Sequence, residues 1–387
     1  MRIDMGLSDA EKAACGAIAG HCAATRKESA VRFSDLLGDV PAFAFATKNQ
    51  IDSIVAHSHG ETPDASGQWH AAHQEMQHRL SAYLVELDHV AELLLTRGIS
   101  LVALKNGGIA RGIYPCPGCC PMGDLDVLVK KDDFREAHRI MLADGYHFEF
   151  RSPLEEAELE AAELGGGAEY WKFLSNGDKL WFELQWRPVA GRWLRPDQEP
   201  SAEELMQRSV PIPGTAVRLL SPEDNLLQVS LHTAKHTYVR APGFRLHLDV
   251  ERIVRSQSVD WDIFTERVER LQVKTPVYFS LLLPKEFFGT PIPDSVLNRL
   301  RPSRWKENLI LAWLERSGFF NPDERKFGRL GYIVFNMLLY DDIKGLLRSV
   351  VPDHDWMMRH YSISHRALLP IYHAKRLTDL IFRRIKT

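Results

Sequence analysis

The chain has 387 residues, a length that predicts two or three structural units rather than one. Hydrophobic residues make up 45% and charged residues 26%, as in folded proteins with a substantial core. The formal net charge of −3 gives no global electrostatic drive toward nucleic acid or anionic membranes.

The cysteines and the lengths of the apolar segments indicate in which cellular compartment we expect the protein. The five cysteines are an odd number, and three of them lie together at Cys116, Cys119 and Cys120, which does not fit a secreted disulfide framework. The N-terminal sequence lacks an apolar signal core. An apolar run such as YIVFNMLLY at 332–340 is about half of the roughly 20 residues that a spanning helix needs. We therefore expect a cytoplasmic protein with no membrane span.

Helical periodicity dominates the start of the chain. Residues 7–60 are predicted to form helices, and a loop containing Gly, Pro, Asp and Ser follows at 60–68. From Trp69 to Arg97, leucine and alanine at helical spacing predict one long helix, with Gly98 as its stop.

A small unit of strands and helices comes next. Its predicted elements are a buried strand at 99–105, a Gly107-Gly108 turn into a helix, a loop rich in proline and cysteine at 115–123, a strand at 124–130, an amphipathic helix at 132–146, a short HFEFR strand, and two strands around an SNGD turn. The predicted helix at 132–146 has Asp132 as its N-cap and Gly145 as its stop.

From residue 220 onward the pattern is helical almost to the end. Ser221 followed by Pro, Glu and Asp is a helix-start signature. The order predicts an α+β fold, in which a small mixed-sheet core of about five strands is flanked by N-terminal and C-terminal helical regions. The predicted domains are 1–97, 98–215 and 216–387.

Two aspartates, Asp124 and Asp126, are one residue apart on a predicted strand. Residues at this spacing point to the same face, so the two carboxylates repel each other unless cations neutralise them. A pair of divalent ions solves this problem and suits in-line displacement at phosphorus. Mg²⁺ takes one or two carboxylates together with substrate phosphates, so a nucleotide would complete such a site.

The Gly107-Gly108 pair supplies a second element of the hypothesis. A glycine turn that leads into a helix lets backbone N–H groups approach a phosphate, and the helix dipole favours its negative charge. Lys105 stands just before the pair and adds a point charge.

A third carboxylate is expected to complete a two-metal site, and Glu183 is the candidate. In WFELQWR, alternation places Trp181, Glu183 and Gln185 on one strand face. Glu183 would be a metal ligand and a general base.

Each of these features also has an ordinary structural interpretation. A single Asp-x-Asp is common in solvated loops, a Gly-Gly pair can be only a turn, and Glu183 can be the polar side of a half-exposed strand. Their order along the chain favours a nucleotidyl-transfer site.

These segments resemble the nucleotidyltransferase core of the DNA polymerase beta superfamily, and more narrowly the bacterial family of uncharacterised nucleotidyltransferases. The resemblance rests on ALKNGG, DLDVLV, MLADGY, FELQW and PEDNLLQVSLHTAKH, and runs from about residue 75 to about residue 300. It implies the fold, metal dependence and a nucleoside triphosphate donor, and it implies no acceptor. Two departures are Gln185, where the family tends to have His, and Asn106 with an extra Gly in the phosphate turn.

The helix after Ser221 carries further candidates. His232 and His236 share a helical face, and with Lys235 they could contact the triphosphate or the acceptor; Lys235 and His236 are taken as nucleotide-binding. A zinc half-site and a polar stripe at a domain interface remain alternatives. Asp249 matches an Asp of the family pattern, and a structural salt bridge is at least as good an explanation as catalysis.

The cysteine loop has two interpretations. Cys116, Cys119 and Cys120 could hold Zn²⁺ with a fourth ligand such as a His, but only one Cys-x-x-Cys is present. We expect reduced thiols beside the active site and no structural metal; the loop could instead gate the site or block it on oxidation. The N-terminal histidines, which include His57 and His73, form no recognised metal motif.

The predicted function is metal-dependent nucleotidyl transfer with Mg²⁺ or Mn²⁺. An acceptor hydroxyl attacks the α-phosphorus of an NTP such as ATP, and pyrophosphate leaves. The modest charge favours a small-molecule, peptide or protein acceptor over long nucleic acid. The alternatives are a non-catalytic nucleotide-binding or interaction protein on the same fold, and AMP transfer onto a partner protein in a toxin–antitoxin-like pair.

Overall fold

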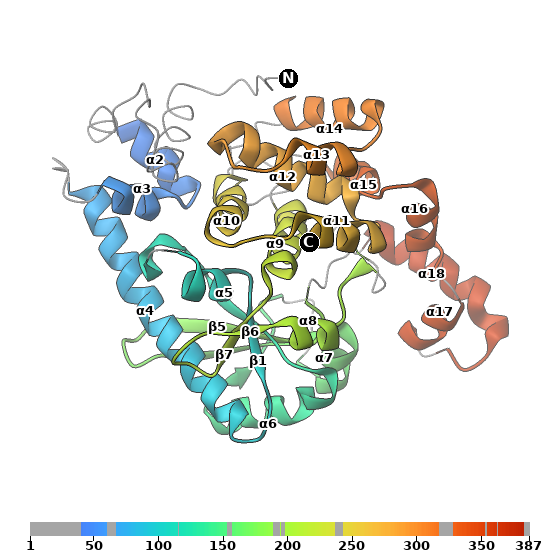
Figure 1. The fold of residues 1–387 in the computed structure, drawn as a ribbon. Helices are drawn as coiled ribbons and strands as arrows, with labels where there is room; N and C mark the ends of the chain where they lie inside the picture. The colour runs from blue at the N-terminus through green and yellow to red at the C-terminus, as the bar shows by residue number, and fades with distance from the viewer. Residues whose placement is uncertain are drawn as a thin grey trace.

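A mixed β-sheet lies to one side of a large group of helices (Figure 1). The computed structural model describes residues 40–59, 67–114, 116–152, 157–188, 194, 198–236, 243–316, 328–352, 354–361 and 363–382. Along the chain, helices come before the first strand and after the last strand of the sheet. This order confirms the predicted α+β class.

The sheet has seven strands in the order β3-β4-β5-β2-β1-β7-β6. The strands are β1 Leu101–Leu104, β2 Asp124–Leu128, β3 His147–Phe148, β4 Gly167–Phe173, β5 Lys179–Gln185, β6 Val210–Pro211 and β7 Val217–Leu219. β2 runs parallel to β5 and antiparallel to β1, and β1 runs parallel to β7. The expected count of about five strands was too low because β6 and β7 are too short to show a period of two in the sequence.

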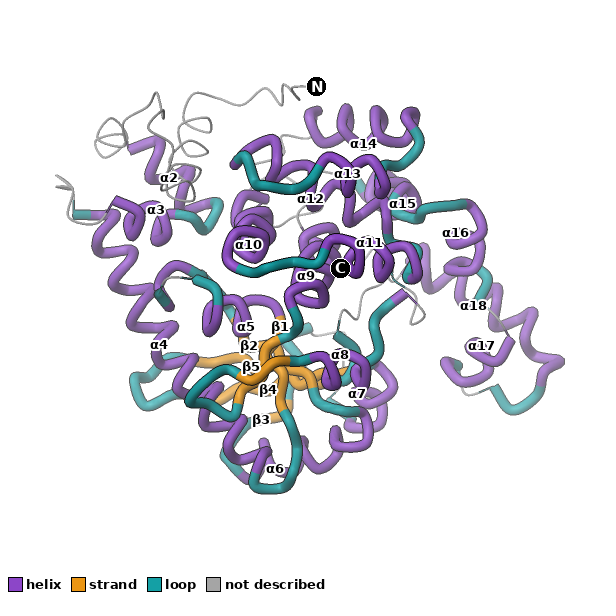
Figure 2. Tube along the Cα trace, viewed as in Figure 1, coloured by secondary structure: helices purple, strands orange, loops and turns teal. Residues whose placement is uncertain are grey.

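Helices make up most of the remaining described chain (Figure 2). They are α2 Val40–Lys48, α3 Asp52–His59, α4 Gln68–Leu95, α5 Lys105–Gly112, α6 Phe134–Ala143, α7 Leu159–Gly165, α8 Ala202–Arg208, α9 Pro222–His236, α10 Gly243–Ser256, α11 Trp261–Arg270, α12 Lys274–Phe288, α13 Asp294–Leu300, α14 Arg304–Arg316, α15 Arg329–Leu338, α16 Ile343–Val350, α17 His354–His360 and α18 Leu369–Phe382. Short 3₁₀ helices are η2 Pro117–Cys119, η3 Lys131–Asp133 and η5 Arg366–Leu368.

The ends of several helices follow from local chemistry. Ser221 accepts a hydrogen bond from the Asp224 backbone N–H (3.3 Å), which confirms the predicted start of α9. α6 differs from the prediction because η3 precedes it, so Asp132 is not its N-cap. Gly145 has a φ of 85°, the left-handed conformation that glycine adopts easily after a helix.

One continuous hydrophobic core joins the sheet to its helical neighbours. It includes the buried face of α4, strand residues such as Leu125 and Phe182, and buried residues of α9, α10 and α12. α4 runs along the sheet, and α9 connects the sheet to the helices above it in Figure 1. The division at residues 97 and 215 stays a prediction.

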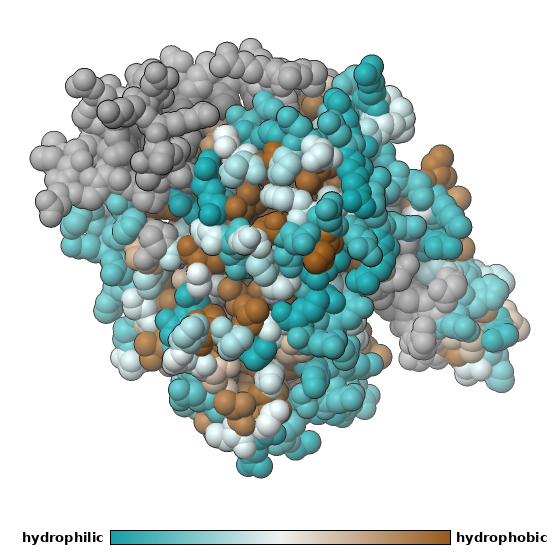
Figure 3. All heavy atoms as spheres, in the orientation of Figure 1, coloured by the Kyte–Doolittle hydropathy of each residue, from teal (hydrophilic) through white to brown (hydrophobic). Residues whose placement is uncertain are grey.

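The surface view in Figure 3 shows hydrophobic residues in small groups between hydrophilic ones. Among the helices of the described residues, none is both long enough and apolar enough to cross a bilayer.

Candidate active site

Two neighbouring parallel strands bring the three predicted carboxylates together. In the register of β2 and β5, Asp126 stands opposite Glu183, and Asp124 lies two residues before Asp126. The intervening Leu125 and the neighbouring Phe182 are fully buried in the main core. Because strand side chains alternate, the carboxylates share the other face of the sheet.

Two protein cations bridge these carboxylates. Lys105 Nζ lies 2.5 Å from Asp126 Oδ1 and 3.8 Å from Glu183 Oε2. Arg151, which follows β3, donates through Nη1 to Asp124 Oδ2 (2.6 Å), through Nη2 to Glu183 Oε1, and through Nε to Glu169 Oε2 (2.9 Å). Two cations, one at each end of the cluster, therefore offset part of the negative charge of the four carboxylates.

Gln185 completes the polar contacts on this face. Its amide Nε2 donates to Asp126 Oδ1 (2.8 Å) and to Glu183 Oε2 (2.7 Å). In this chain a neutral amide links the two carboxylates, so it holds their geometry without changing their total charge.

The electrostatics of the site follow from burial and crowding. Burial disfavours the Lys105 cation, but attraction from Asp126, Glu183 and Asp124 outweighs it and holds the pKa of Lys105 above its usual value. Burial raises the pKa of Asp126 well above its ordinary range, and Lys105 opposes this rise. The carboxylate cluster therefore needs a cation close to Asp126 to stay ionised.

The backbone of Lys105 is held in an unusual conformation. Its φ is 47°, in the left-handed region that a non-glycine residue rarely adopts. Its backbone N–H donates to Gln228 Oε1 on α9 (3.0 Å), and Gln228 Nε2 donates to the Pro188 carbonyl (3.1 Å). Such a conformation costs about 1–2 kcal/mol. Gln228 thus fixes the residue whose side chain reaches Asp126.

The Gly107-Gly108 pair does not form a separate turn, which corrects the prediction. α5 already begins at Lys105, so both glycines lie in its first turns and are buried. A Cβ at Gly108 would come within 2.8 Å of the Ala103 carbonyl oxygen and 3.1 Å of Leu219 Cδ1. Close packing of α5 on β1 is enough to require glycine at 108. Contact of the pair with phosphate stays a prediction.

We expect Gly108→Ala to lower the free energy of unfolding by about 1–3 kcal/mol, the usual cost of overpacking. The clash is with backbone, which cannot move aside as a side chain can. Urea denaturation measures the effect. Gly165→Ala is the matched control, because nothing lies within 4 Å of a Cβ at this helix end. Equal stability of the two variants would contradict the packing argument.

The structure bears differently on the candidate site residues predicted on α9 and on α10. α9 extends to His236, but the side chains of Lys235 and His236 lie outside the described residues, so their nucleotide contacts stay a prediction. Asp249 is 2% exposed and accepts a hydrogen bond from the Tyr114 hydroxyl (2.8 Å). Arg245 Nη2 lies 3.8 Å from its other oxygen. These contacts favour the structural explanation of Asp249.

Sequence reasoning missed three residues that touch this cluster. Glu169 stands opposite Glu183 in the β4–β5 pair, so counting the register back from the SNGD hairpin would have found it. Arg151 lies beyond the short edge strand β3, and Gln228 lies on a helix far along the chain. No local pattern marks either residue, because their partners are brought near only by folding.

Carboxylates on adjacent parallel strands thus lie beside a strand–helix junction that presents a lysine. The chain belongs to the family of uncharacterised nucleotidyltransferases, whose model matches residues 46–289, more than half of the chain. No curated protein and no solved structure gives a significant match. Family membership assigns nucleotidyl transfer, with an NTP as substrate, as the general role.

Proposed function

We propose that this protein is a metal-dependent nucleotidyltransferase that moves a nucleoside monophosphate from an NTP to a hydroxyl group. The acceptor is a small molecule, a peptide or a protein. A bond forms between the acceptor oxygen and the α-phosphorus, the bond from the α-phosphorus to the bridging oxygen breaks, and pyrophosphate leaves. The placement of Asp124, Asp126 and Glu183 on one face of paired parallel strands carries the proposal.

The residues of this face fit Mg²⁺ or Mn²⁺. Asp124, Asp126 and Glu183 offer only carboxylate oxygens, the donors that these hard cations prefer. In the described part of the chain, the oxygens of these three carboxylates do not all lie within 4.8 Å of one another. Lys105 and Arg151 bridge them instead. Bound ions would supply Lewis-acid stabilisation of the charge on the transferring phosphate.

The protein's own side chains have the remaining roles, which are proton transfer, charge stabilisation and phosphate contact. Glu183 takes the proton of the acceptor hydroxyl, since its Oε1 and Oε2 face the cluster and its side chain is 20% exposed. Lys105 opposes the rise that burial causes in the pKa of Asp126, and it keeps a positive charge where the triphosphate binds. Gly107, Gly108, Lys235 and His236 are proposed to contact the phosphates.

The proposal is tested with all four NTPs in the presence of Mg²⁺ or Mn²⁺. Thermal shift identifies the nucleotide, because a ligand that binds the native state raises apparent stability. NTP labelled at the α-phosphorus is then incubated with fractionated cell extract. We expect the label to move to an acceptor with an equal amount of pyrophosphate formed. Release of orthophosphate without pyrophosphate would exclude nucleotidyl transfer.

One observation supports a second candidate function. Lys105 and Arg151 already offset part of the negative charge of the carboxylates, as they would in a non-catalytic nucleotide-binding protein on this fold. That candidate predicts NTP binding that needs no divalent ion and gives no pyrophosphate. The same experiment therefore separates these two functions. Transfer of AMP onto a partner protein, the third alternative, would appear as label on a protein.

We expect Arg151→Gln to tighten Mn²⁺ binding roughly fivefold, the scale of about 1 kcal/mol for a partly exposed ion pair. Arg151 bonds to Asp124, Glu169 and Glu183, so it competes with a divalent ion for the same oxygens. Mn²⁺ binding is followed by electron paramagnetic resonance.

Arg135→Gln is the control for Arg151→Gln, because Arg135 forms an exposed pair with Glu163 away from the cluster. Its Mn²⁺ affinity should equal that of the parent. Weaker Mn²⁺ binding by the Arg151 variant would show that Arg151 does not compete with the ion.

A further inference from the structure

We propose that His57, His73, Cys116 and Cys119 form a structural zinc site, separate from the carboxylate cluster. One ligand atom from each of these four residues lies within 4.8 Å of the other three. The prediction that the cysteine loop holds no metal rested on the lack of further ligands with recognisable spacing. The structure supplies two histidines from α3 and α4, 59 and 43 residues before Cys116.

The two sulfur–nitrogen distances at Cys116 fit one tetrahedral ion. Cys116 Sγ lies 3.6 Å from His57 Nδ1 and 3.7 Å from His73 Nε2. Zinc bonds of about 2.3 Å to sulfur and 2.1 Å to nitrogen give a tetrahedral sulfur–nitrogen edge of about 3.6 Å. Cys116 Sγ and Cys119 Sγ are 3.1 Å apart, and the two imidazole centroids are 5.1 Å apart. The sulfurs are not bonded to each other, and they would move apart to the roughly 3.8 Å that two zinc–sulfur bonds of about 2.3 Å require.

Hydrogen bonds orient His73 for metal binding. Its Nδ1 lies 3.0 Å from the Ser53 carbonyl oxygen, which can only accept, so Nδ1 carries the proton. The lone pair of the neutral ring is then on Nε2, the atom that faces Cys116. A histidine ligand held through its other nitrogen by a backbone carbonyl is the usual arrangement around zinc.

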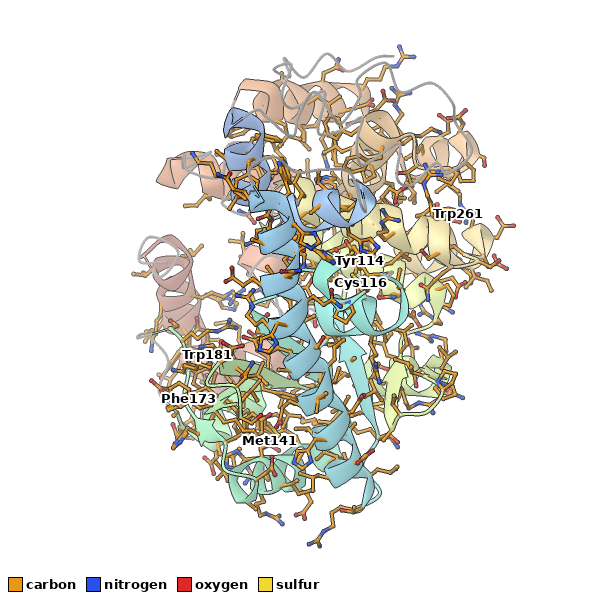
Figure 4. The ribbon with its side chains drawn as sticks, turned by 90° about the vertical axis from the view of Figure 1, so that its left-hand side faces the viewer. Tyr114, Cys116, Met141, Phe173, Trp181 and Trp261 are labelled. Carbon is orange, nitrogen blue, oxygen red and sulfur yellow. The ribbon has the colours of Figure 1, made fainter. Side chains whose placement is uncertain are left out.

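The loop between the cysteines is fitted closely against α4. Gly118 would place a Cβ 2.9 Å from His73 Cε1 and 3.0 Å from Gln77 Cβ, so a larger residue would push the loop off the helix. Ser53 Oγ donates to the Gly118 carbonyl (2.5 Å) and so links α3 to the same loop. Figure 4 shows Cys116 beside α4, next to Tyr114.

Two thiolates and two imidazoles select zinc among the common ions. Mg²⁺ and Ca²⁺ prefer oxygen ligands, whereas a closed Cys₂His₂ set is a structural zinc site with no open position for substrate. Such an ion would fasten α3, α4 and η2 together. The chain from η2 leads directly into β2, which begins at Asp124. The zinc site would therefore stabilise the segment that leads to Asp124, the first carboxylate of the candidate active site.

The test begins with the full-length protein, expressed with zinc in the medium and purified under reducing conditions without chelator. We expect about one zinc ion per chain, and X-ray absorption that gives two sulfur and two nitrogen ligands. Cobalt exchanged into the site should show the intense visible absorption of tetrahedral cobalt with thiolate ligands. These measurements need no variant and no nucleotidyl-transfer activity.

Variants assign the ligands. Cys116→Ser, Cys119→Ser and His73→Gln should each reduce bound zinc at least tenfold after dialysis, and lower the melting temperature. Cys120→Ser is the control for the cysteines, since Cys120 is buried next to the site but bonds to the Asn106 carbonyl. His70→Gln is the control for His73 on the same helix, because His70 Nε2 lies 2.9 Å from Gln74 Nε2 and is not one of the four grouped ligands. Both controls should keep their zinc.

Two results would overturn the inference. The first is reduced parent protein that, after incubation with equimolar Zn²⁺ and desalting, keeps less than about a tenth of an ion per chain. The second is X-ray absorption with oxygen or nitrogen ligands only. Neither result would bear on nucleotidyl transfer, which depends on the separate carboxylate cluster.

Discussion

Asp126→Asn is expected to abolish nucleotidyl transfer. Asp126 is 2% exposed and faces Glu183 across the β2–β5 pair, so its carboxylate is the innermost oxygen donor of the cluster. An amide has no negative charge to hold a divalent ion beside the triphosphate. Pyrophosphate release with the best NTP measures the loss, with water as acceptor until the natural acceptor is found.

The same substitution should also weaken the fold, because Lys105 loses its closest partner. The Lys105 side chain is 12% exposed, and its Nζ lies 2.5 Å from Asp126 Oδ1, whereas Glu183 Oε2 is farther away at 3.8 Å. Breaking one side of a buried pair costs about 3 kcal/mol. We therefore expect Asp126→Asn to lower the free energy of unfolding as well as activity.

Asp124→Asn separates chemistry from stability. Asp124 is 20% exposed and pairs with Arg151, which keeps Glu169 and Glu183 as partners. We expect it to abolish transfer with a melting temperature close to the parent's. Asp132→Asn, on η3 just after β2, is the control and should keep full activity. A double variant of Asp124 and Asp126 that bound Mg²⁺–NTP as tightly as the parent would remove both from the site.

The part of the site that the sequence predicted rests on strand periodicity. Alternation along β2 predicted that Asp124 and Asp126 share one face, and alternation along β5 separated Glu183 from Phe182 and Leu184. These are local patterns. The pairing of β5 beside β2 was implied only by the resemblance to the nucleotidyltransferase core.

The rest of the site could not be predicted because it depends on folding over long separations. Arg151 reaches carboxylates 18 to 32 residues away from a segment with no periodicity. The His57–Cys116 contact joins a helix near the start of the chain to a loop before β2. The start of α5 at Lys105 was hidden because two glycines predict a turn, and only the packing of Gly108 on β1 explains them in a helix.

Glu183→Gln tests the chemical step itself. A base takes part in the transition state more than in substrate binding, so its loss should lower turnover and leave NTP affinity nearly unchanged. We expect pyrophosphate release to fall roughly a hundredfold or more, the usual effect of losing a general base. Glutamine keeps the size of the side chain and can still accept from the Gln185 amide, which now donates to Glu183 Oε2 at 2.7 Å.

The control for Glu183→Gln is Glu169→Gln, because both carboxylates bond to Arg151 and stand opposite each other in the β4–β5 pair. If the loss of activity came only from releasing Arg151, the two variants would lose activity alike. A base at Glu183 predicts a loss in turnover for Glu183→Gln alone, and a pH–rate profile whose acidic limb disappears in that variant. Parental turnover in Glu183→Gln would leave proton transfer to another group or to solvent, with Glu183 holding charge and geometry only.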